Sequence, residues 1–334
     1  MEKTMREAAL YRSKLYAEVR SFFNQRDYVE VDTPSLSLDL IPEPTIENFG
    51  TRFDNEFIGS TDLYLIPSPE VYMKKLIAMG FGSVYQLSHC FRNSEQIGKI
   101  HNPEFSMLEY YTMGADEQDS IGITEELFAH IAPRNGVDHL RPPFAHLTVE
   151  EAMKRYANID LDQHQSQRTL ALEARKLGLQ VPEEKESWEE TFNRIFLTFV
   201  EPNLPQDKPL VLDRYPAQID CLAKRDGNYR KRWEMYIGGV EVANCYDEER
   251  NPEVVRSYYR KEYAKLVQKR TETGSVIPDA DPDFADIFKN FPQCSGVAIG
   301  MDRLLMLLMG KTDLRGVILF PLSGMLGSGK NCNI

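Results

Sequence analysis

Two alternating segments joined by a polar loop constrain the fold of this chain more than any other feature. VYQLSHCFRN and EFSMLEYYTM alternate with the period of two that is typical of β-strands, and residues 93–103 connect them. The connection is polar and contains glycine and proline, as loops do. We therefore predict a long antiparallel hairpin with Arg92 at the base of its loop.

The rest of the chain supplies helices and further strands around this hairpin. Residues 5–27 place apolar side chains on one side of a predicted helix. LYLIPSPE is predicted to be a strand whose end presents Ser68 and Glu70 to a cleft. The Gly-Gly bend within KRWEMYIGGVEVANCYDEE predicts a second strand pair, and GVAIGMDRLLMLLMG predicts a glycine-rich strand that turns into an apolar helix.

Composition limits the possible partners. The 334 residues suggest one large domain or one and a half, and the formal charge of -12 disfavours a general polyanion binder, although a local basic patch is compatible with it. The five cysteines are scattered without a CxxC pair, so we expect reduced thiols in the cytoplasm, with neither disulfides nor zinc. The N-terminus lacks a signal peptide's apolar core, and residues 299–309 are too short to span a bilayer, so no membrane association is expected.

Several residues have the chemistry of a nucleotide site. The Arg92 guanidinium can meet α-phosphate oxygens with two donors, and Arg303 at the glycine-rich turn can hold the γ-phosphate. Phe105, beside His101 and Asn102, can stack on adenine. A surface ion pair for Arg92 and a core position for Phe105 are the simpler interpretations of each residue alone. Glu234 and Glu241 can be surface charges on a strand, but they can also bind magnesium, which takes oxygen ligands.

Carboxylates are in excess near the predicted nucleotide site. It costs free energy to cluster Glu70, Glu109 and Glu248 unless a cation balances their negative charge. An ammonium group of a substrate is a suitable cation. Asn244 and Tyr111 can complete its hydrogen bonds. The pattern therefore favours activation, with ATP, of an amino acid that carries two amines.

Three motifs together resemble one enzyme family. FRNSEQIGKIHNPEFSMLEYY resembles motif 2, GVAIGMDR resembles motif 3 and YVEVDTP resembles the end of motif 1 of class II synthetases. Nearly the whole chain is similar to the catalytic core of lysyl-tRNA synthetases, and more closely to their short paralogues that lysylate elongation factor P. The resemblance implies an α+β fold, with an antiparallel sheet of six or more strands flanked by helices, in a homodimer.

The resemblance also assigns roles to individual residues. It implies that a lysine-like substrate is bound by Ser68, Pro69, Glu70, Glu109, Tyr111, Asn244, Glu248 and Ala298. It implies that ATP is bound by Arg92, Asn93, Glu95, His101, Asn102, Phe105, Glu241, Val242, Gly300 and Arg303, with Arg92 and Arg303 catalytic and magnesium on Glu234 and Glu241. The implied reaction forms an aminoacyl-adenylate and then transfers the acyl group to a lysine amine of elongation factor P, without a protein nucleophile.

Three features favour the paralogue over the synthetase. The resemblance begins almost at residue 1, which leaves no room for the N-terminal OB domain that holds the anticodon, so tRNA is not the expected partner. Ser68 and Ala298 stand where the synthetases generally have alanine and glycine. Such additions to a tight pocket cost an ill-fitting substrate roughly 1–3 kcal/mol, and in the paralogues they accompany a preference for (R)-β-lysine over α-lysine.

Some boundaries and alternatives stay open at this level. We predict a catalytic domain over residues 1–325, in which 115–210 is a mostly helical insertion, and a mobile tail over 326–334. The loop carries one extra residue, so either Ser94 or Glu95 contacts ATP. A truncated lysyl-tRNA synthetase and an inactive lysine-binding regulatory paralogue are the alternative functions, and retention of Arg92, Arg303 and both magnesium-site glutamates disfavours the second.

Overall fold

The computed structural model describes residues 2–94, 97–135, 140–182 and 186–327. Glu95 and residues 328–334 of the predicted tail lie outside these ranges. Within them, no helix is long and apolar enough to cross a membrane.

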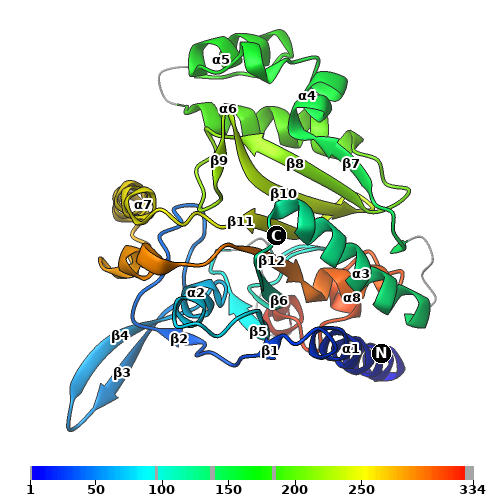
Figure 1. Ribbon diagram of the computed structural model, residues 1–334, viewed down its shortest axis with the longest axis vertical. Coiled ribbons are helices and arrows are strands. Elements are labelled where there is room, and N and C mark those ends of the chain that lie inside the picture. Colours follow the sequence, from blue (N-terminus) through cyan, green and yellow to red (C-terminus); the bar gives the residue numbers. More distant parts are fainter. Residues whose placement is uncertain (1, 95–96, 136–139, 183–185, 328–334) are drawn as a thin grey trace.

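A nine-stranded sheet forms the centre of the molecule (Figure 1). Its main path runs in the order β1, β5, β6, β12, β11, β10, β8, β7, and β9 pairs with β10. The strands are β1 (Val29–Glu30), β5 (Val84–Phe91), β6 (Glu104–Met113), β7 (Ala145–Thr148), β8 (Leu210–Pro216), β9 (Arg225–Asp226), β10 (Tyr229–Ile237), β11 (Val240–Asp247) and β12 (Cys294–Gly300).

The sheet is mixed rather than wholly antiparallel. β5 and β6 form the predicted hairpin, and the six strands from β5 to β8 along the path are antiparallel to their neighbours. At the two ends of the path, β1 joins β5 and β7 joins β8 in parallel. The expected α+β architecture, with an antiparallel sheet of six or more strands flanked by helices, is confirmed, and a parallel pair extends that sheet at each end. They are parallel because long connections, rather than tight turns, precede or follow each end strand.

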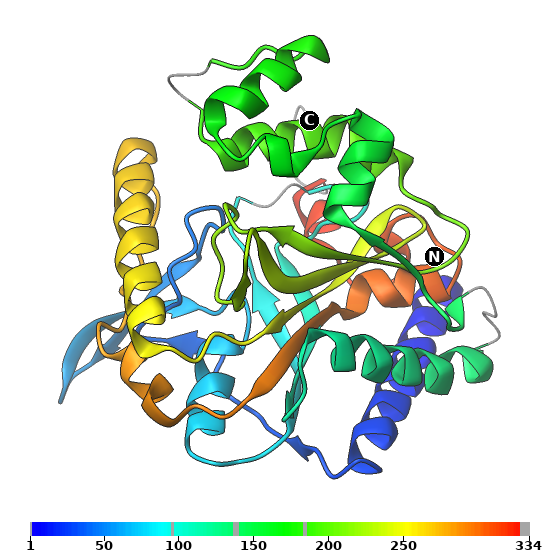
Figure 2. The ribbon, with the colours of Figure 1, turned by 45° about the horizontal axis from the view of Figure 1, so that its top comes forward.

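Helices cover both faces of the sheet (Figure 2). α1 (Glu2–Asn24), α3 (Glu117–Asn135) and α8 (Met301–Leu308) share one apolar cluster with the central strands. A second cluster joins α2 (Glu70–Ala78), α7 (Pro252–Thr273) and the 3₁₀ helix η5 (Phe284–Asn290) to other strand residues. The short η6 (Leu314–Gly316) and α9 (Leu322–Gly327) complete the C-terminal part of the described chain.

A helical layer covers β7 and β8 at one end of the molecule. It contains α4 (Val149–Ala157), η2 (Leu161–Gln163), α5 (Gln167–Lys176), α6 (Trp188–Ile195), the π-helical turn η3 (Phe196–Val200) and η4 (Glu201–Asn203). Reciprocal capping boxes at Thr148 and Ser187 begin α4 and α6. Residues 115–210 are thus largely helical, but α3 packs into the central core and β7 joins the main sheet.

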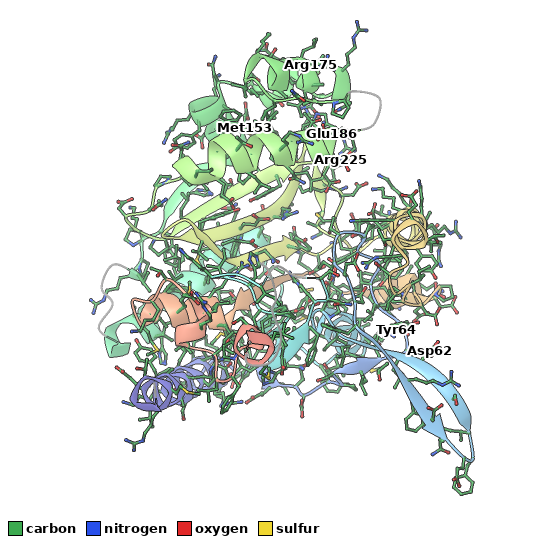
Figure 3. All side chains as sticks on the ribbon, turned by 180° about the vertical axis from the view of Figure 1, so that it is seen from behind. Asp62, Tyr64, Met153, Arg175, Glu186 and Arg225 are labelled. Atoms are coloured by element: carbon green, nitrogen blue, oxygen red, sulfur yellow. The ribbon has the colours of Figure 1, made fainter. Side chains whose placement is uncertain are left out.

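A small three-stranded sheet lies far from this helical layer. It consists of β2 (Leu36–Ser37), β3 (Gly50–Asn55) and β4 (Gly59–Leu65) in the order β2, β4, β3. In Figure 3, Asp62 and Tyr64 mark the β4 side of the projecting hairpin, while Met153, Arg175 and Glu186 mark the helical layer at the other end. The segment after β4 leads directly to the N-terminus of α2, where Ser68 and Glu70 lie.

Candidate active site

Three adjacent strands of the main sheet form the floor of the site. On β12, Val297 and Ile299 enter the apolar core, so the alternate residues Gly296 and Ala298 face the opposite side. The register places Ala298 between Glu109 on β6 and Asn244 on β11. A strand of small residues thus runs between two strands of polar ones, which creates a trough.

Gly296 makes room in this trough for two side chains that line it. A Cβ atom at this position would stand 2.5 Å from a Tyr111 ring carbon and 2.7 Å from Glu248 Oε1, closer than real Cβ atoms approach. Tyr111 and Tyr246 are its register partners on the two flanking strands. Glycine is therefore required at this position, because the Tyr111 ring and the Glu248 carboxylate occupy the space next to its Cα.

One cavity of about 90 Å³ lies over this floor and is rich in carboxylates. We call it the amino-acid cavity. Its lining comprises Glu43, Pro67, Ser68, Glu70, Arg92, Met107, Glu109, Tyr111, Asn244, Tyr246, Glu248, Gly296, Val297 and Ala298. The structure therefore brings together the predicted substrate residues except Pro69, which occupies the N-cap position of α2 and does not line the cavity.

Lys74 forms ion pairs with two of these carboxylates. Its ammonium lies 2.5 Å from Glu70 Oε1 and 2.8 Å from Glu248 Oε2, and its side chain is 0% exposed. Burial works against this charge, but Glu248 and Glu70 outweigh it and raise the pKa of Lys74 above its usual value. Sequence analysis missed Lys74, although its i,i+4 spacing from Glu70 on a helix was a usable signal.

Among the described residues, Glu109 is the carboxylate of this group that makes no ion pair with Lys74. Tyr111 donates a 2.7 Å hydrogen bond to its Oε1, and its buried Oε2 has no hydrogen-bond partner among the described residues. Burial, followed by the neighbouring Glu70, raises the pKa of Glu109 to about 8. Burial and Glu70 likewise leave the pKa of Glu248 raised to about 7, despite Lys74. A buried carboxylate with a free oxygen is suited to an ammonium ligand.

A second cavity, of about 260 Å³, adjoins the first. We call it the nucleotide cavity. It shares four lining residues with the amino-acid cavity, namely Arg92, Met107, Asn244 and Ala298. It is also lined by the predicted ATP residues His101, Asn102, Phe105, Glu241, Val242, Gly300 and Arg303. Arg92 therefore lies where a group in one cavity can meet a group in the other.

Two arginines frame the nucleotide cavity. The Arg92 guanidinium lies over the Phe105 ring, 5.1 Å from its centroid, which is a cation–π arrangement. Arg303 is the third residue of α8, and it donates to the carbonyl oxygens of Ile100 at 3.1 Å and Glu241 at 2.9 Å. These bonds hold its guanidinium between the hairpin loop and β11.

An ion pair fixes the start of α8 from the opposite side. Arg12 of α1 lies 2.5 Å from Asp302 Oδ1, and Asp302 Oδ2 accepts a 2.6 Å hydrogen bond from the Ser106 backbone. Asp302 lines the nucleotide cavity and directly precedes Arg303. Sequence analysis did not find Arg12, because its partner is 290 residues away.

The predicted magnesium residues are near each other but differ in their surroundings. Glu241 lines the nucleotide cavity, where burial and then the neighbouring Glu234 raise its pKa to about 7. Glu234 lies outside that lining and accepts hydrogen bonds from Tyr215 at 2.5 Å, Tyr236 at 2.9 Å and Arg232. Within the described ranges, no cluster of three or more acidic, His or Cys side chains has metal-binding geometry.

Two further predicted residues have other partners. Asn102 donates to the Glu104 carbonyl at 2.6 Å and accepts from the Leu322 backbone, so it also fixes the start of α9. Asn93 lines neither cavity. Its backbone N–H instead bonds the Glu47 carbonyl at 2.8 Å and ties the hairpin to residues 41–48. Sequence analysis also missed Glu43 and Tyr246, which line the amino-acid cavity.

Comparisons with known proteins agree with this architecture. The sequence profile of the family described as tRNA synthetases class II (D, K and N) matches residues 1–324. The elongation factor P–(R)-β-lysine ligase of Yersinia enterocolitica is 34% identical over 93% of this chain and 94% of its own length. That of Photorhabdus laumondii is 31% identical over 94% of each protein. The lysine–tRNA ligase of Pelotomaculum thermopropionicum is 34% identical over 93% of this chain and 62% of its own length.

These relatives are all ligases, and the matched region includes both cavities. The chain is accordingly an enzyme of the ATP-dependent ligase class. It belongs to the tRNA synthetases class II family of the D, K and N group.

Proposed function

We propose that this protein activates (R)-β-lysine with ATP and transfers the β-lysyl group to a lysine side chain of elongation factor P. The observation that carries the proposal is the junction of the two cavities at Arg92, with carboxylates beyond it. A diamino acid fits this arrangement because its carboxylate can face Arg92 while its amines face glutamates. The names of the Yersinia and Photorhabdus relatives support the same substrate and acceptor.

The reaction has two steps. A substrate carboxylate oxygen attacks the α-phosphorus of ATP, the bond to the bridging oxygen breaks, and pyrophosphate leaves. Arg92 stabilises the charge that grows on the α-phosphate oxygens, and Arg303 binds the departing phosphates. A neutral acceptor amine then attacks the acyl carbon, AMP leaves with the bonding electrons, and the amine proton passes to water. Alignment of the reactants supplies much of the rate.

Two small residues support (R)-β-lysine rather than α-lysine. The Ala298 methyl stands on the floor between Glu109 and Asn244, and Ser68 contributes a hydroxyl at the mouth of α2. Both alter the shape of the space that the substrate occupies over the floor. A difference of this kind is worth roughly 10- to 200-fold in substrate preference.

Magnesium is the metal that the nucleotide cavity fits best. Glu241 offers a carboxylate that is destabilised by Glu234, and a divalent cation would relieve that repulsion. When bound, the ion would neutralise phosphate charge. Glu241 is the better placed ligand because Glu234 already accepts three hydrogen bonds.

Two alternative functions compete with this proposal, and the proposal includes the location and the assembly of the enzyme. The lysine–tRNA ligase relative makes charging of tRNA the nearest alternative, while the acidic balance of -12 disfavours it. An inactive lysine-binding paralogue would not need Arg92 and Arg303 in contact with one cavity. We further propose a cytoplasmic homodimer, the assembly implied by the resemblance of YVEVDTP to motif 1.

Amino-acid-dependent exchange between ATP and labelled pyrophosphate tests the first step. We expect exchange with (R)-β-lysine, weaker exchange with α-lysine and none with glutamate, and we expect Arg92→Met to abolish it. Binding of (R)-β-lysine without any exchange would contradict the proposal and favour an inactive paralogue. Exchange that prefers α-lysine would favour the synthetase-like alternative.

A further inference from the structure

We propose that Glu43 is a further specificity-determining residue, whose carboxylate binds the amine nearest to the substrate's own carboxylate. This inference rests on the proposed function, because it concerns the same cavity and a diamino acid as its ligand. Glu43 lines the amino-acid cavity together with Ser68 and Arg92.

The charges around the cavity leave two carboxylates for a ligand. Glu70 and Glu248 already share the Lys74 ammonium. The Glu43 side chain makes no hydrogen bond or ion pair within the described part of the chain, and Glu109 retains its free Oε2. Two unanswered carboxylates match the two ammonium groups of a diamino acid.

These two carboxylates reach the cavity from different elements of the fold. Glu43 stands on the loop of residues 41–48, which the bond between the Asn93 N–H and the Glu47 carbonyl ties to the strand end that bears Arg92. Glu109 instead stands on β6, beside Ala298 on the floor of the cavity. A substrate whose carboxylate faces Arg92 would thus present its first amine to Glu43 and its distal amine to Glu109.

The loop that carries Glu43 is held in place. Pro42 and Pro44 fix the backbone on both sides, and the Ile46 N–H bonds the Glu43 carbonyl at 3.2 Å. Buried Arg270 of α7 lies 2.8 Å from a Glu47 carboxylate oxygen, and the Glu47 carbonyl accepts the Asn93 N–H. The loop is therefore tied both to α7 and to the strand end that bears Arg92, which fixes Glu43 relative to the phosphate-binding arginine.

Calorimetric binding of two ligands to the full-length enzyme separates the amine subsites. (R)-β-Lysine carries both amines, whereas 6-aminohexanoate carries only the distal one. For Glu43→Gln we expect the Kd of (R)-β-lysine to rise on the order of 10- to 100-fold, because a charge-assisted hydrogen bond is lost. The Kd of 6-aminohexanoate should change less than about twofold, since variation of this size is within ordinary surface effects. Glu43→Asp, which keeps the charge, should recover part of the loss.

The matched control is Glu109→Gln, which should weaken both ligands because both carry the distal amine. Equal weakening of both ligands by Glu43→Gln, or of neither, would overturn the assignment. The proposed function is judged separately, by pyrophosphate exchange in the unaltered enzyme. If the unaltered enzyme catalyses pyrophosphate exchange and Glu43→Gln leaves the Kd of (R)-β-lysine unchanged, only the inference about Glu43 is refuted.

Discussion

At the residue scale, the site depends on carboxylates whose negative charge is balanced by a buried lysine. Sequence analysis predicted Glu70, Glu109 and Glu248 as a group because their excess required a cation. It identified only the substrate as that cation, whereas the structure gives Lys74 to two of the three. The difference arises because Lys74 looks like any polar residue of an amphipathic helix. Its 0% exposure is decided by how α2 packs, which no local pattern reports.

Lys74→Met should destabilise the enzyme strongly. The variant leaves Glu70 and Glu248 without their shared cation, and breaking a buried pair costs about 3–5 kcal/mol. Urea unfolding measures this change. Lys75→Met is the matched control: Lys75 is the next residue of α2 and is partly exposed, with looser ion pairs to Asp39 and Asp281. It should cost less than about 1 kcal/mol. Equal losses for the two variants would contradict a structural role for the buried cation.

Ala298→Gly combined with Ser68→Ala should shift the enzyme toward α-lysine. Removing the methyl deepens the floor beside Glu109, and removing the hydroxyl restores the usual synthetase shape. We expect the ratio of kcat/KM values for (R)-β-lysine and α-lysine to fall by roughly 10-fold or more. Pyrophosphate exchange with each isomer measures it, with KM for ATP as an internal control. An unchanged ratio would show that selectivity resides elsewhere.

The raised pKa of Glu109 predicts a pH-dependent stability. The pKa is about 8 in the folded protein against 4.5 for an ordinary glutamate, so the folded state binds more protons between these values. This residue therefore lowers the stability of the ligand-free enzyme as pH rises from about 4.5 to about 8. Glu109→Gln should gain stability relative to the parent over that range, as urea unfolding at pH 5.5 and 8 can measure. If the difference in unfolding free energy between Glu109→Gln and the parent were the same at both pH values, the raised pKa would be refuted. Glu56→Gln, at an exposed position, is the control.

At the element scale, local signals were sufficient for most of the site. The period of two in residues 84–113 predicted the hairpin, and the glycine-rich turn predicted the strand-to-helix passage from β12 to α8. The strand register was not predictable, because the alignment of Glu109, Ala298 and Asn244 across three strands depends on pairings between segments far apart in the chain. The contacts of α1 with α8 have the same long-range origin.

Arg12→Met should weaken ATP binding selectively. Arg12 holds Asp302, and Asp302 is followed by Arg303 at the start of α8. Loss of the ion pair should let this turn move and raise KM for ATP on the order of 10-fold, with a smaller effect on KM for the amino acid. Arg20→Met is the control from the same helix, because Arg20 pairs with Glu30 at the surface. Equal increases in both KM values would indicate a general loss of structure instead of a positioning role.

At the scale of the whole molecule, the fold was predictable from the three motifs and the remaining segments were not. The α+β sheet and the two adjoining cavities follow from elements whose sequence patterns are strong. The helical layer over β7 and β8 carries no chemical motif, so its packing could be described only as helical periodicity before the structure was known.

The most direct measurement is the intact mass of purified elongation factor P after incubation with this enzyme, ATP, Mg²⁺ and either (R)-β-lysine or α-lysine. We expect a gain of one lysyl group on the acceptor, faster with (R)-β-lysine, and none with Arg92→Met. No gain with either isomer, while pyrophosphate exchange continues, would contradict elongation factor P as the acceptor.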